Sequence, residues 1–435
     1  MKQISVLFSI ILSTAVASNS NNGDDGSKSN QQHKQTSSRR RFIELREEEH
    51  EIGYLLGLTL HDPPLYSEKS TYQDIEIFES DHFGKVFVLD ECLQLTERDA
   101  ANYNEMLAHV PIMEYYGKQG GQTYPEGMQE GTGTESQDNI SGRSNSRSHE
   151  QLNVLVLGGG DGYVVSEVLK HPIVKNVDHC ELDEKVIQVS ETFFPWAKDL
   201  WKTRSSSSEV NGQRKKEGTV HLYVEDGAKF LEKKASSLSS TTIATQSNDA
   251  YHIIIQDSSD PFVMESNGEI TTLPSHVLYT RDHFENIYKI LKKTNGVLIF
   301  QAETYNIPSN LVEIRKWREL LMDIGFQHVR YGSISTPTYS TGQIGFFVAH
   351  ALSLDDDEEE RDENACSNRQ TDKGNKGSGA FCLNEQERGD FLDYEAMNVY
   401  FKSVNFSTQY YHPPIHRGAF DLPLWVHQYI NGLKR

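Results

Sequence analysis

Positive charge is scarce in this sequence, which has 42 lysines and arginines against 63 aspartates and glutamates and a formal net charge of −21. Proteins that bind nucleic acid or anionic lipid usually present a basic patch or stripe. The charge balance therefore argues against a nucleic acid partner and against docking on an anionic membrane. It is compatible with a small cationic substrate.

Cysteine is also rare, with four residues in the whole chain and none in a C-x-x-C pair. A disulfide scaffold needs a much higher density of cysteines, and a structural zinc site needs closely spaced thiol or imidazole ligands. We therefore expect no disulfide framework and predict no metal site. The sequence leaves open whether Cys366 and Cys382, which both lie in an acidic stretch, form a bridge.

Long hydrophobic runs are confined to the N-terminus. Lys2 precedes an apolar stretch from Ile4 to Val16, and Ala15-Val16-Ala17 fits a cleavage site with small residues. The run is too short to span a bilayer comfortably, and the pattern is typical of a signal peptide. We predict a signal-like segment over 1–17 and no membrane association after its cleavage, with a buried first helix or strand as the alternative.

Several stretches have no hydrophobic periodicity and are rich in Ser, Gly, Asn, Gln and charge. Such composition buries too little apolar surface to offset the entropy lost on ordering. We expect a disordered polar tail over 18–40 and insertions without structure at 117–150, 203–217, 235–249 and 354–390. The remaining sequence divides into a small β domain over 41–116 and a larger domain over 151–435.

The ordered parts have two different patterns. Residues 72–96 alternate and contain β-branched and aromatic residues, which predicts short antiparallel strands with a turn near Phe83-Gly84. From residue 151, apolar runs such as LNVLVL and YHIIIQ alternate with helical segments, which indicates βαβ units with both faces of the sheet covered. The fold class predicted is α/β, with a Rossmann-like, mostly parallel sheet and a small N-terminal antiparallel β domain.

Two carboxylates follow one of the buried strands. Asp257 and Asp260 come directly after the apolar run Ile253–Ile255. In open α/β sheets the ligand lies beyond the carboxyl ends of the strands, so we expect both side chains to line a site. The alternative is that they cap the next helix, but Pro261 and a long mixed segment delay that helix.

A glycine-rich turn, Gly158–Tyr163, connects the first strand of this series to a helix. Glycines allow a tight turn and a close approach to a ligand. A dinucleotide fingerprint would have glycine where Tyr163 stands, and Asp161 would repel a pyrophosphate. Glu181 ends the next strand, where an acid can accept the ribose hydroxyls, and Asp226-Gly227 ends the third. The pattern favours a nucleoside without phosphates, as in folds that bind S-adenosylmethionine.

Eight segments, in order over roughly 41–435, give the chain a resemblance to the polyamine aminopropyltransferase family, and to spermidine synthases above all. They are YQDI at 72–75, LTERDAANYNEM at 95–106, GGGDGYVVSEVLKH at 158–171, CELDEKVIQVS at 180–190, EDGAKF at 225–230, DSSDP at 257–261, STPTYSTGQIGF at 335–346 and IHRGAFDLP at 415–423.

The resemblance implies a reaction and its participants. A spermidine synthase transfers the aminopropyl group of decarboxylated S-adenosylmethionine to putrescine and gives spermidine and methylthioadenosine. No cofactor is implied, because the decarboxylated S-adenosylmethionine is a co-substrate. The family also implies a homodimer. Its members are mostly cytoplasmic, whereas the signal-like N-terminus points to the secretory pathway or an organelle, so the compartment stays open.

The resemblance also implies roles for individual residues. Asp257 corresponds to the base that deprotonates the attacking amine. The positions implied for nucleoside binding are Gln73, Glu181, Asp226, Gly227 and Pro274. The positions implied for amine binding are Tyr103, Asn104, Asp161, Asp260 and Tyr339.

The chain departs from the family at three places. Asn104 stands where the family has Gln or His, Tyr163 replaces a glycine, and the loop 262–274 is longer, with Pro274 restoring the loop proline. Loops at the mouth of a site often act as lids, so this segment leaves the exact amine acceptor open. The alternatives are a spermine or thermospermine synthase, a putrescine N-methyltransferase, and a non-catalytic homologue.

Overall fold

The computed structural model describes residues 38–44, 53, 56–118, 151–202, 209–210, 213–214, 219–240, 250–264, 270–352, 391–405 and 407–433. The segments predicted at 1–17 and 117–150 therefore lie outside the described residues, apart from 117 and 118, and so does all of 354–390. The same holds for Cys366 and Cys382. The domain limits stay a prediction.

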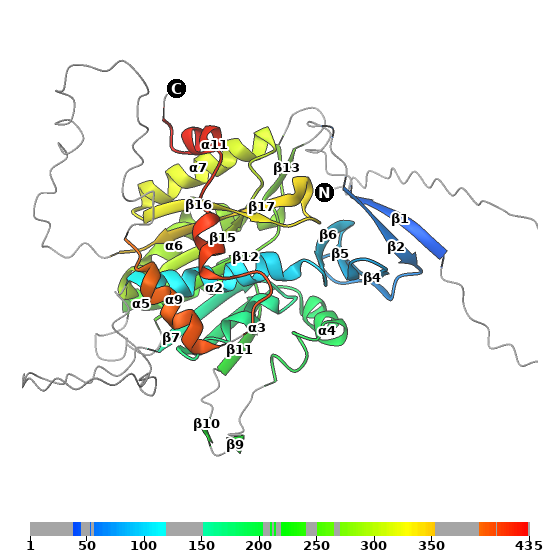
Figure 1. Ribbon diagram of the computed structural model, residues 1–435, viewed down its shortest axis with the longest axis horizontal. Coiled ribbons are helices and arrows are strands. Elements are labelled where there is room, and N and C mark those ends of the chain that lie inside the picture. The colour runs from blue at the N-terminus through cyan, green and yellow to red at the C-terminus, as the bar shows by residue number, and fades with distance from the viewer. Residues whose placement is uncertain are drawn as a thin grey trace, which may run out of the picture. The chain divides into compact units, whose positions relative to one another are not determined.

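The N-terminal part forms two small antiparallel sheets (Figure 1). One pairs β1 (Ser38–Glu44) with β2 (Leu56–Asp62), so ordered structure begins inside the tail expected over 18–40. The other has four strands in chain order, β3 (Tyr66–Lys69), β4 (Asp74–Ser80), β5 (Gly84–Leu89) and β6 (Cys92–Thr96). The turn that joins Ser80 to Gly84 confirms the predicted turn near Phe83-Gly84.

Alternation along these strands gives the four-stranded sheet two buried faces. Phe78, Val86 and Val88 pack with leucines of β2 on one face. Ile77 and Phe87 belong to the opposite face, which packs against helices of the larger sheet. Since side chains alternate along a strand, a sheet buried on both sides needs apolar residues at successive positions, as in FVL of β5.

The larger sheet has seven strands in the order β11-β8-β7-β12-β15-β17-β16. The first five run parallel, and β17 and β16 complete one edge in antiparallel pairings. This arrangement confirms the predicted α/β fold class. The strands are β7 (Leu152–Gly158), β8 (Val174–Glu181), β11 (Thr219–Val224), β12 (Ile253–Asp257), β15 (Val297–Ala302), β16 (Gln327–Ser335) and β17 (Gln343–His350).

The run of three isoleucines in β12 is explained by helices on both faces of this sheet. Ile253 and Ile255 belong to the core under one helical layer, and Ile254 belongs to the core under the other. All three side chains are fully buried. Full burial of an isoleucine contributes about 1.5–3 kcal/mol relative to exposure, so the central strand is held strongly from both sides.

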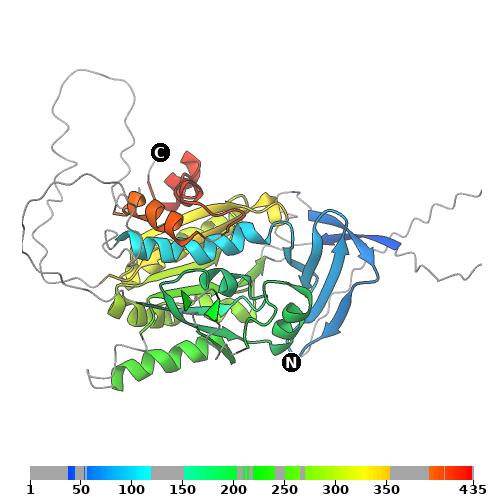
Figure 2. The same cartoon turned by 60° about the horizontal axis from the view of Figure 1, so that its bottom comes forward.

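One helical layer consists of α2 (Ala100–Lys118), α3 (Tyr163–Val168), α9 (Tyr394–Val404) and α10 (Pro413–Gly418). Figure 2 shows α2 lying along the sheet with α9 beside it. The predicted boundary at 116 assigns α2 to the N-terminal domain, whereas its buried residues join the core of the large sheet. The other layer contains α5 (Gly227–Ser240), α6 (Arg281–Leu291), α7 (Pro308–Ile324) and α11 (Leu424–Ile430).

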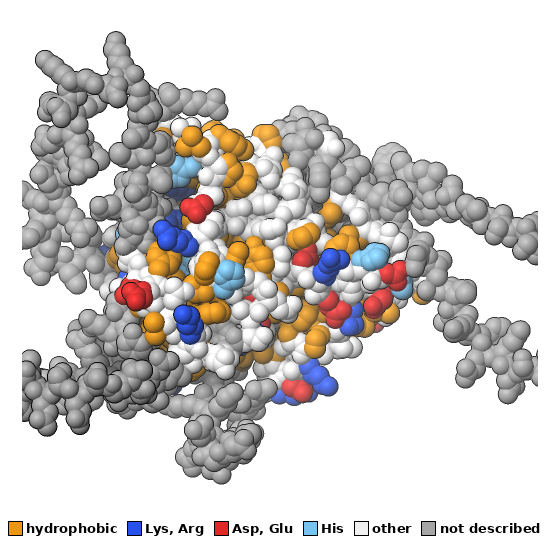
Figure 3. Space-filling view, viewed as in Figure 1, with side chains coloured by type: hydrophobic (Ala, Val, Ile, Leu, Met, Phe, Trp, Pro, Cys, Tyr) orange, Lys and Arg blue, Asp and Glu red, His pale blue; other side chains and the backbone are white. Residues whose placement is uncertain are grey.

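The remaining elements are short. A ten-residue helix, α4 (Glu184–Phe193), follows β8 and packs on the N-terminal sheet. In the described part of the chain, the 3₁₀ helices are η2 (Pro274–Tyr279), η3 (Lys292–Thr294) and η4 (Ser340–Gly342). On the surface of α7 and α11, Met322, Leu424 and Trp425 are exposed, and Figure 3 shows hydrophobic side chains gathered there.

Structure extends into three stretches where little was expected. Helix α5 continues to Ser240, inside the stretch predicted without structure from 235, because Leu231, Ala235 and Leu238 pack on the core below it. Two-residue strands β9 (Glu209–Val210) and β10 (Gln213–Arg214) pair within 203–217. In the long loop, β13 (Phe262–Met264) pairs antiparallel with β14 (Ile270–Thr272).

A buried carboxylate ties α2 to the antiparallel edge and to α10. Glu114 accepts hydrogen bonds from Arg330 of β16, from His350 Nε2 of β17 at 2.7 Å and from His416 Nε2 of α10 at 3.1 Å. Burial acts to raise the pKa of Glu114, but the charge of Arg330 and the two histidine hydrogen bonds hold it well below its ordinary value. The glutamate is therefore ionised and balances the buried guanidinium.

Replacing Glu114 with Ala would leave the Arg330 charge buried without this partner. We expect the free energy of unfolding to fall by about 3–5 kcal/mol, measured by urea unfolding followed by circular dichroism. The matched control is Glu319→Ala, which removes an exposed partner of Arg315 and should change stability by at most about 0.5 kcal/mol. Equal effects of the two substitutions would show that the buried network does not stabilise the fold.

Candidate active site

Three carboxylates meet at the carboxyl edge of the parallel strands. Asp257 is the last residue of β12, Glu181 is the last residue of β8, and Asp161 lies in the turn after β7, the strand between them. A β-carbon placed on Gly159 would lie 2.8 Å from Oδ2 of Asp257, and one on Gly160 would lie 2.9 Å from Oε2 of Glu181. The glycine turn therefore runs between these two acids.

Backbone geometry explains the glycines of this turn. Gly158, Gly159 and Gly162 have φ values of 76°, 69° and 77°, a region that L side chains rarely adopt. A side chain at Gly158 would also collide with the carbonyl of Asp257, its partner in the ladder between β7 and β12. The sequence thus brings the backbone of β7 against the strand that ends in Asp257.

The three acids hold protons more tightly than isolated carboxyls do. Burial, followed by the charge of Asp257, raises the pKa of Asp161 to about 8, although Tyr163 N donates to its Oδ1 at 2.8 Å. Burial raises the pKa of Glu181 to about 7, with smaller contributions from the charges of Asp183 and Asp257. Burial also raises the pKa of Asp257 to about 6. A cation bound among them would favour their ionised forms.

Asp257 has a hydroxyl partner from another layer of the fold. Tyr103 of α2 donates from its hydroxyl to Oδ1 of Asp257 at 2.7 Å, which lowers the pKa of Asp257 against the effect of burial. The pKa of Tyr103 itself is raised well above its ordinary value by burial and then by the charge of Asp257. The phenol therefore remains protonated and orients one carboxylate oxygen, while the other faces Gly159.

Glu181 is linked to the N-terminal sheet through Asp183. The backbone N–H of Asp183 donates to Oε1 of Glu181 at 2.9 Å, and its own carboxylate caps α4 by accepting from Lys185 N. Ser70 Oγ and Gln73 Nε2 donate to Oδ2 of Asp183 at 2.6 and 3.1 Å. The loop between β3 and β4 thus brings Gln73 beside the end of β8.

Asp226, which follows the end of β11, contacts mainly the first residues of helix α5. Oδ1 of Asp226 accepts from the backbone N–H groups of Ala228 and Lys229, so it caps α5, which begins at Gly227. Partial burial acts to raise the pKa of Asp226, but the hydrogen bonds from Lys229 bring it below its ordinary value. The charges of Asp226 and Glu181 both contribute to raising the pKa of Cys180, because β11 lies next to β8 and their ends are close together.

A second group of acids lies around Tyr279. Its buried hydroxyl donates to Oε1 of Gln301 at 3.0 Å, and Gln301 Nε2 donates to Oδ1 of Asp260 at 3.2 Å. Burial raises the pKa of Tyr279, and the charges of Asp260, Glu303 and Asp257 raise it further. Tyr279 therefore lies within electrostatic reach of all three carboxylates, so the acidic lining continues from Asp257 toward β15.

Tyr339 completes this group from the antiparallel edge of the sheet. Its hydroxyl donates to Oε2 of Glu303 at 2.6 Å, and Glu303 is 3% exposed. Glu303 directly follows β15, so it is another acid at a carboxyl end of a parallel strand.

Two predicted site residues have other surroundings. Asn104 is 3% exposed, and its Nδ2 donates to the carbonyl of Ala100 in its own helix. Pro274 is exposed and begins η2, where proline favours a first helical turn. Their implied binding roles stay predictions.

The sequence analysis missed four residues that hold the site together, namely Ser70, Asp183, Gln301 and Glu303. A usable signal existed for Asp183 and Glu303, because each lies within two residues of the end of a parallel strand, close to the positions that Asp257 and Glu181 have on their own strands. Ser70 and Gln301 gave none, since their partners Asp183 and Asp260 are distant in the chain.

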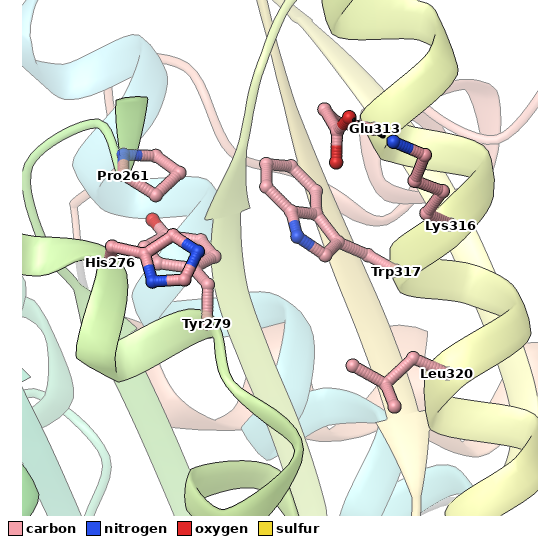
Figure 4. A pocket seen from close by; sticks show the side chains of 7 residues that line it. All are labelled: Pro261, His276, Tyr279, Glu313, Lys316, Trp317 and Leu320. Atoms are coloured by element: carbon pink, nitrogen blue, oxygen red, sulfur yellow. Dashed lines mark hydrogen bonds and ion pairs between the residues drawn. The ribbon is translucent and has the colours of Figure 1, made fainter. Parts of the chain in front are cut away.

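A surface cavity of about 200 Å³ lies behind Tyr279, between η2 and α7 (Figure 4). Pro261, His276 and Tyr279 line one side, and Trp317 and other side chains of α7 line the opposite side. None of the predicted site residues lines this cavity. Among the described residues, no group of three or more His, Cys, Asp and Glu has the arrangement to hold a metal ion. In the same part of the chain, no helix is long and apolar enough to cross a bilayer.

Known proteins resemble the chain in sequence and in fold. Residues 136–357 match a family model described as "Spermine/spermidine synthase domain", and residues 59–97 match one described as "Spermidine synthase tetramerisation domain". A spermidine synthase of Schizosaccharomyces pombe is 31% identical over 289 residues, which cover 66% of this chain and 71% of the relative. A spermine synthase of Arabidopsis thaliana is 32% identical over 286 residues, 65% of this chain and 59% of the relative.

The fold has solved counterparts. The crystal structure of spermidine synthase from Thermotoga maritima aligns with a TM-score of 0.58 and 20% sequence identity, covering 92% of this chain and 98% of that one. At this identity the likeness concerns the fold alone.

The raised pKa of Asp161 predicts a pH-dependent stability. An unfolded aspartate has a pKa of about 3.9, whereas folding raises that of Asp161 to about 8. The contribution of Asp161 to the free energy of unfolding therefore falls as pH rises from about 4 to 8. The variant Asp161→Asn does not titrate, so its advantage over the wild type should grow by at least about 1 kcal/mol across that window. Chemical unfolding at several pH values measures this.

The control for this prediction is Asp226→Asn, because the pKa of Asp226 is lowered instead of raised. The stability of Asp226→Asn relative to the wild type should not increase with pH. The variant should be less stable than the wild type, because the ionised form of Asp226 favours the folded state. If the Asp161→Asn advantage is flat between pH 4 and 8, burial and the charge of Asp257 do not raise the pKa of Asp161 in the folded protein.

Proposed function

This chain belongs to the spermidine synthase family of polyamine aminopropyltransferases, and from that premise we propose that it acts as a spermidine synthase. The reaction transfers the aminopropyl group of decarboxylated S-adenosylmethionine to putrescine and gives spermidine and methylthioadenosine. The observation on which the proposal chiefly rests is the hydrogen bond from Tyr103 to Asp257, at the edge of a cluster of buried acids.

Chemistry of the acceptor explains the need for such a carboxylate. An alkyl amine has a pKa near that of lysine, about 10.4, so at pH 7 it is protonated and cannot attack. Asp257, oriented by Tyr103, takes the proton as the amine nitrogen attacks the carbon beside the sulfonium. The carbon–sulfur bond breaks, its electron pair stays on sulfur, and the leaving methylthioadenosine is a neutral thioether. A pKa of about 6 suits a base that works near neutral pH.

The remaining acids divide between the two substrates. Asp161 receives the amine of the aminopropyl group, and Glu181, with Gln73 beside it, receives the ribose. Asp226 and Gly227 approach the adenine, and Pro274 contacts the nucleoside at the mouth of the site. Asn104 is assigned to the amine-binding side. The far amine of putrescine reaches Asp260 and Tyr339. Charge-assisted hydrogen bonds of this kind are stronger than neutral ones, which suits a dication.

Glu303 joins this far end. Its carboxylate accepts a hydrogen bond from Tyr339, and its charge, like that of Asp260, raises the pKa of Tyr279. These four polar groups would surround a second ammonium. An acceptor with amines at both ends would thus contact acids at both ends.

Assembly is a second part of the proposal. The family resemblance implied a homodimer, and the family description over 59–97 refers to tetramerisation. Both support an oligomer whose contacts include the N-terminal strands. Light scattering coupled to size-exclusion chromatography distinguishes a dimer from a tetramer.

Spermine synthase is the second candidate, because the Arabidopsis thaliana spermine synthase and the Schizosaccharomyces pombe spermidine synthase are similarly identical to this chain. The test is to incubate the protein with decarboxylated S-adenosylmethionine and either putrescine or spermidine, and to identify products by mass. We expect spermidine from putrescine at the higher kcat/KM. A preference for spermidine would identify a spermine synthase. Methylation with ordinary S-adenosylmethionine would identify an N-methyltransferase, and no product would indicate a non-catalytic homologue.

Replacing Asp257 with Asn removes the base but keeps the shape and the Tyr103 contact. We expect kcat to fall by about 100-fold or more, with the affinity for methylthioadenosine unchanged, because the nucleoside does not contact this side chain. Steady-state kinetics and calorimetry measure the two effects. The matched control is Asp323→Asn, an exposed acid on α7, which should retain wild-type turnover. A kcat for Asp257→Asn close to that of the control would mean that another group deprotonates the amine.

A further inference from the structure

The segment after α4 contains two of the four tryptophans of the sequence, Trp196 and Trp201. Both indole groups reach the glycine turn that carries Asp161, and no role was assigned to either of them above. Both side chains are partly buried and belong to the core between the N-terminal sheet and α4. Their contacts therefore connect the position of the turn to that core.

Trp196 holds the turn at Asp161 itself. Its Nε1 donates to the backbone carbonyl of Asp161 at 3.0 Å. Its ring stacks on Tyr163, with centroids 4.5 Å apart and planes 19° apart. Tyr163 in turn donates from its backbone N–H to Oδ1 of Asp161 at 2.8 Å. The backbone and the carboxylate of Asp161 are thus both restrained by one pair of stacked rings.

Trp201 holds the other end of the turn through a histidine. Its Nε1 donates to Nδ1 of His179 at 2.8 Å. An indole N–H can only donate, so Nδ1 accepts and the proton of the neutral ring is on Nε2. Nε2 therefore donates to the carbonyl of Gly158, 2.8 Å away. Burial lowers the pKa of His179 to about 4, which keeps the ring neutral.

Trp201 also closes the space beside the turn. A β-carbon on Gly162 would lie 2.8 Å from the Trp201 ring, so the indole packs directly on the backbone there. Gly158, at the other end, pairs with Asp257 in the ladder between β7 and β12. The relay from Trp201 through His179 therefore ends next to the strand that supplies the acid proposed as the base.

We propose that Trp196 and Trp201 form a clamp that fixes the turn 158–162 and thereby positions Asp161 for the aminopropyl ammonium of the donor. The two tryptophans are positioning residues, because they act through Asp161, His179 and the turn and do not contact the reacting atoms. The role of Asp161 in this inference rests on the proposed function. The clamp itself rests only on the contacts of the turn.

The clamp predicts different effects on two ligands that share the nucleoside. Decarboxylated S-adenosylmethionine has the aminopropyl amine that Asp161 would receive, whereas methylthioadenosine lacks it. If Asp161 is held less firmly, the protein should therefore bind decarboxylated S-adenosylmethionine more weakly, while its affinity for methylthioadenosine should not change. General destabilisation of the nucleoside pocket would weaken both.

The test uses Trp196→Phe, which keeps an aromatic ring for Tyr163 and removes the indole N–H. Loss of one neutral hydrogen bond should raise the KM for decarboxylated S-adenosylmethionine by about three- to tenfold. The affinity for methylthioadenosine, measured by calorimetry, should stay within about twofold of the wild type, because this ligand lacks the amine that Asp161 would receive and so loses no hydrogen bond. Trp425→Phe, a half-exposed tryptophan on α11, is the matched control and should leave both values unchanged.

A second measurement does not depend on activity. Hydrogen exchange of the backbone amides in 158–163 should be faster in Trp196→Phe and in Trp201→Phe than in Trp425→Phe, by about three- to tenfold. If the wild type makes no aminopropyl product but exchange follows this order, the proposed function fails and the clamp stands. If exchange in this segment is the same in all three variants, or if Trp196→Phe weakens both ligands equally, the clamp is overturned.

Discussion

Repulsion among buried carboxylates is the constraint on which the rest of this structure depends. Asp161, Glu181 and Asp257 come from three different chain segments. Besides burial, the charge of Asp257 disfavours the ionised forms of Asp161 and Glu181, and the charge of Glu181 disfavours that of Asp161. No unfolded chain would bring them together, so the fold must hold them against that repulsion. It does so with elements that cannot adjust easily, namely a fully buried parallel sheet and a glycine turn set against the end of β12.

The small N-terminal sheet belongs to the same arrangement. One of its faces packs with Tyr163, Val186 and Phe194, which lie on or next to the helices that follow the glycine turn and β8. Its β3–β4 loop reaches Asp183 through Ser70 and Gln73. Helix α2, which directly follows the sheet, carries Tyr103 to Asp257. The site is therefore closed from one side by a sheet that contributes few of the acids but limits how far they can move apart.

Sequence patterns predicted the parts of this design that follow from local rules. Alternation of apolar strands with helices gave the parallel sheet, and the rule that ligands bind beyond carboxyl ends directed attention to Asp257, Glu181 and the glycine turn. Partners such as Gln301 and Trp196 were missed because a hydrogen bond between distant segments leaves no periodic trace. The side chain of Asn104 is buried and bonds to its own helix, whereas that of its neighbour Tyr103 reaches the site. Successive side chains of a helix point in different directions, so adjacent residues need not share a site.

The order of the pKa values suggests how one site can both hold a dication and deprotonate an amine. The hydroxyl of Tyr103 lowers the pKa of Asp257 against the effect of burial, so at neutral pH Asp257 is mostly ionised. Burial and the charge of Asp257 raise the pKa of Asp161 to about 8, so Asp161 is mostly protonated. Under the proposed function, the donor ammonium displaces the proton of Asp161 and neutralises the resulting charge. The acceptor then meets an Asp257 that is already a base. Because their surroundings give Asp161 and Asp257 different pKa values, the negative charge of the site increases only when a cationic substrate binds.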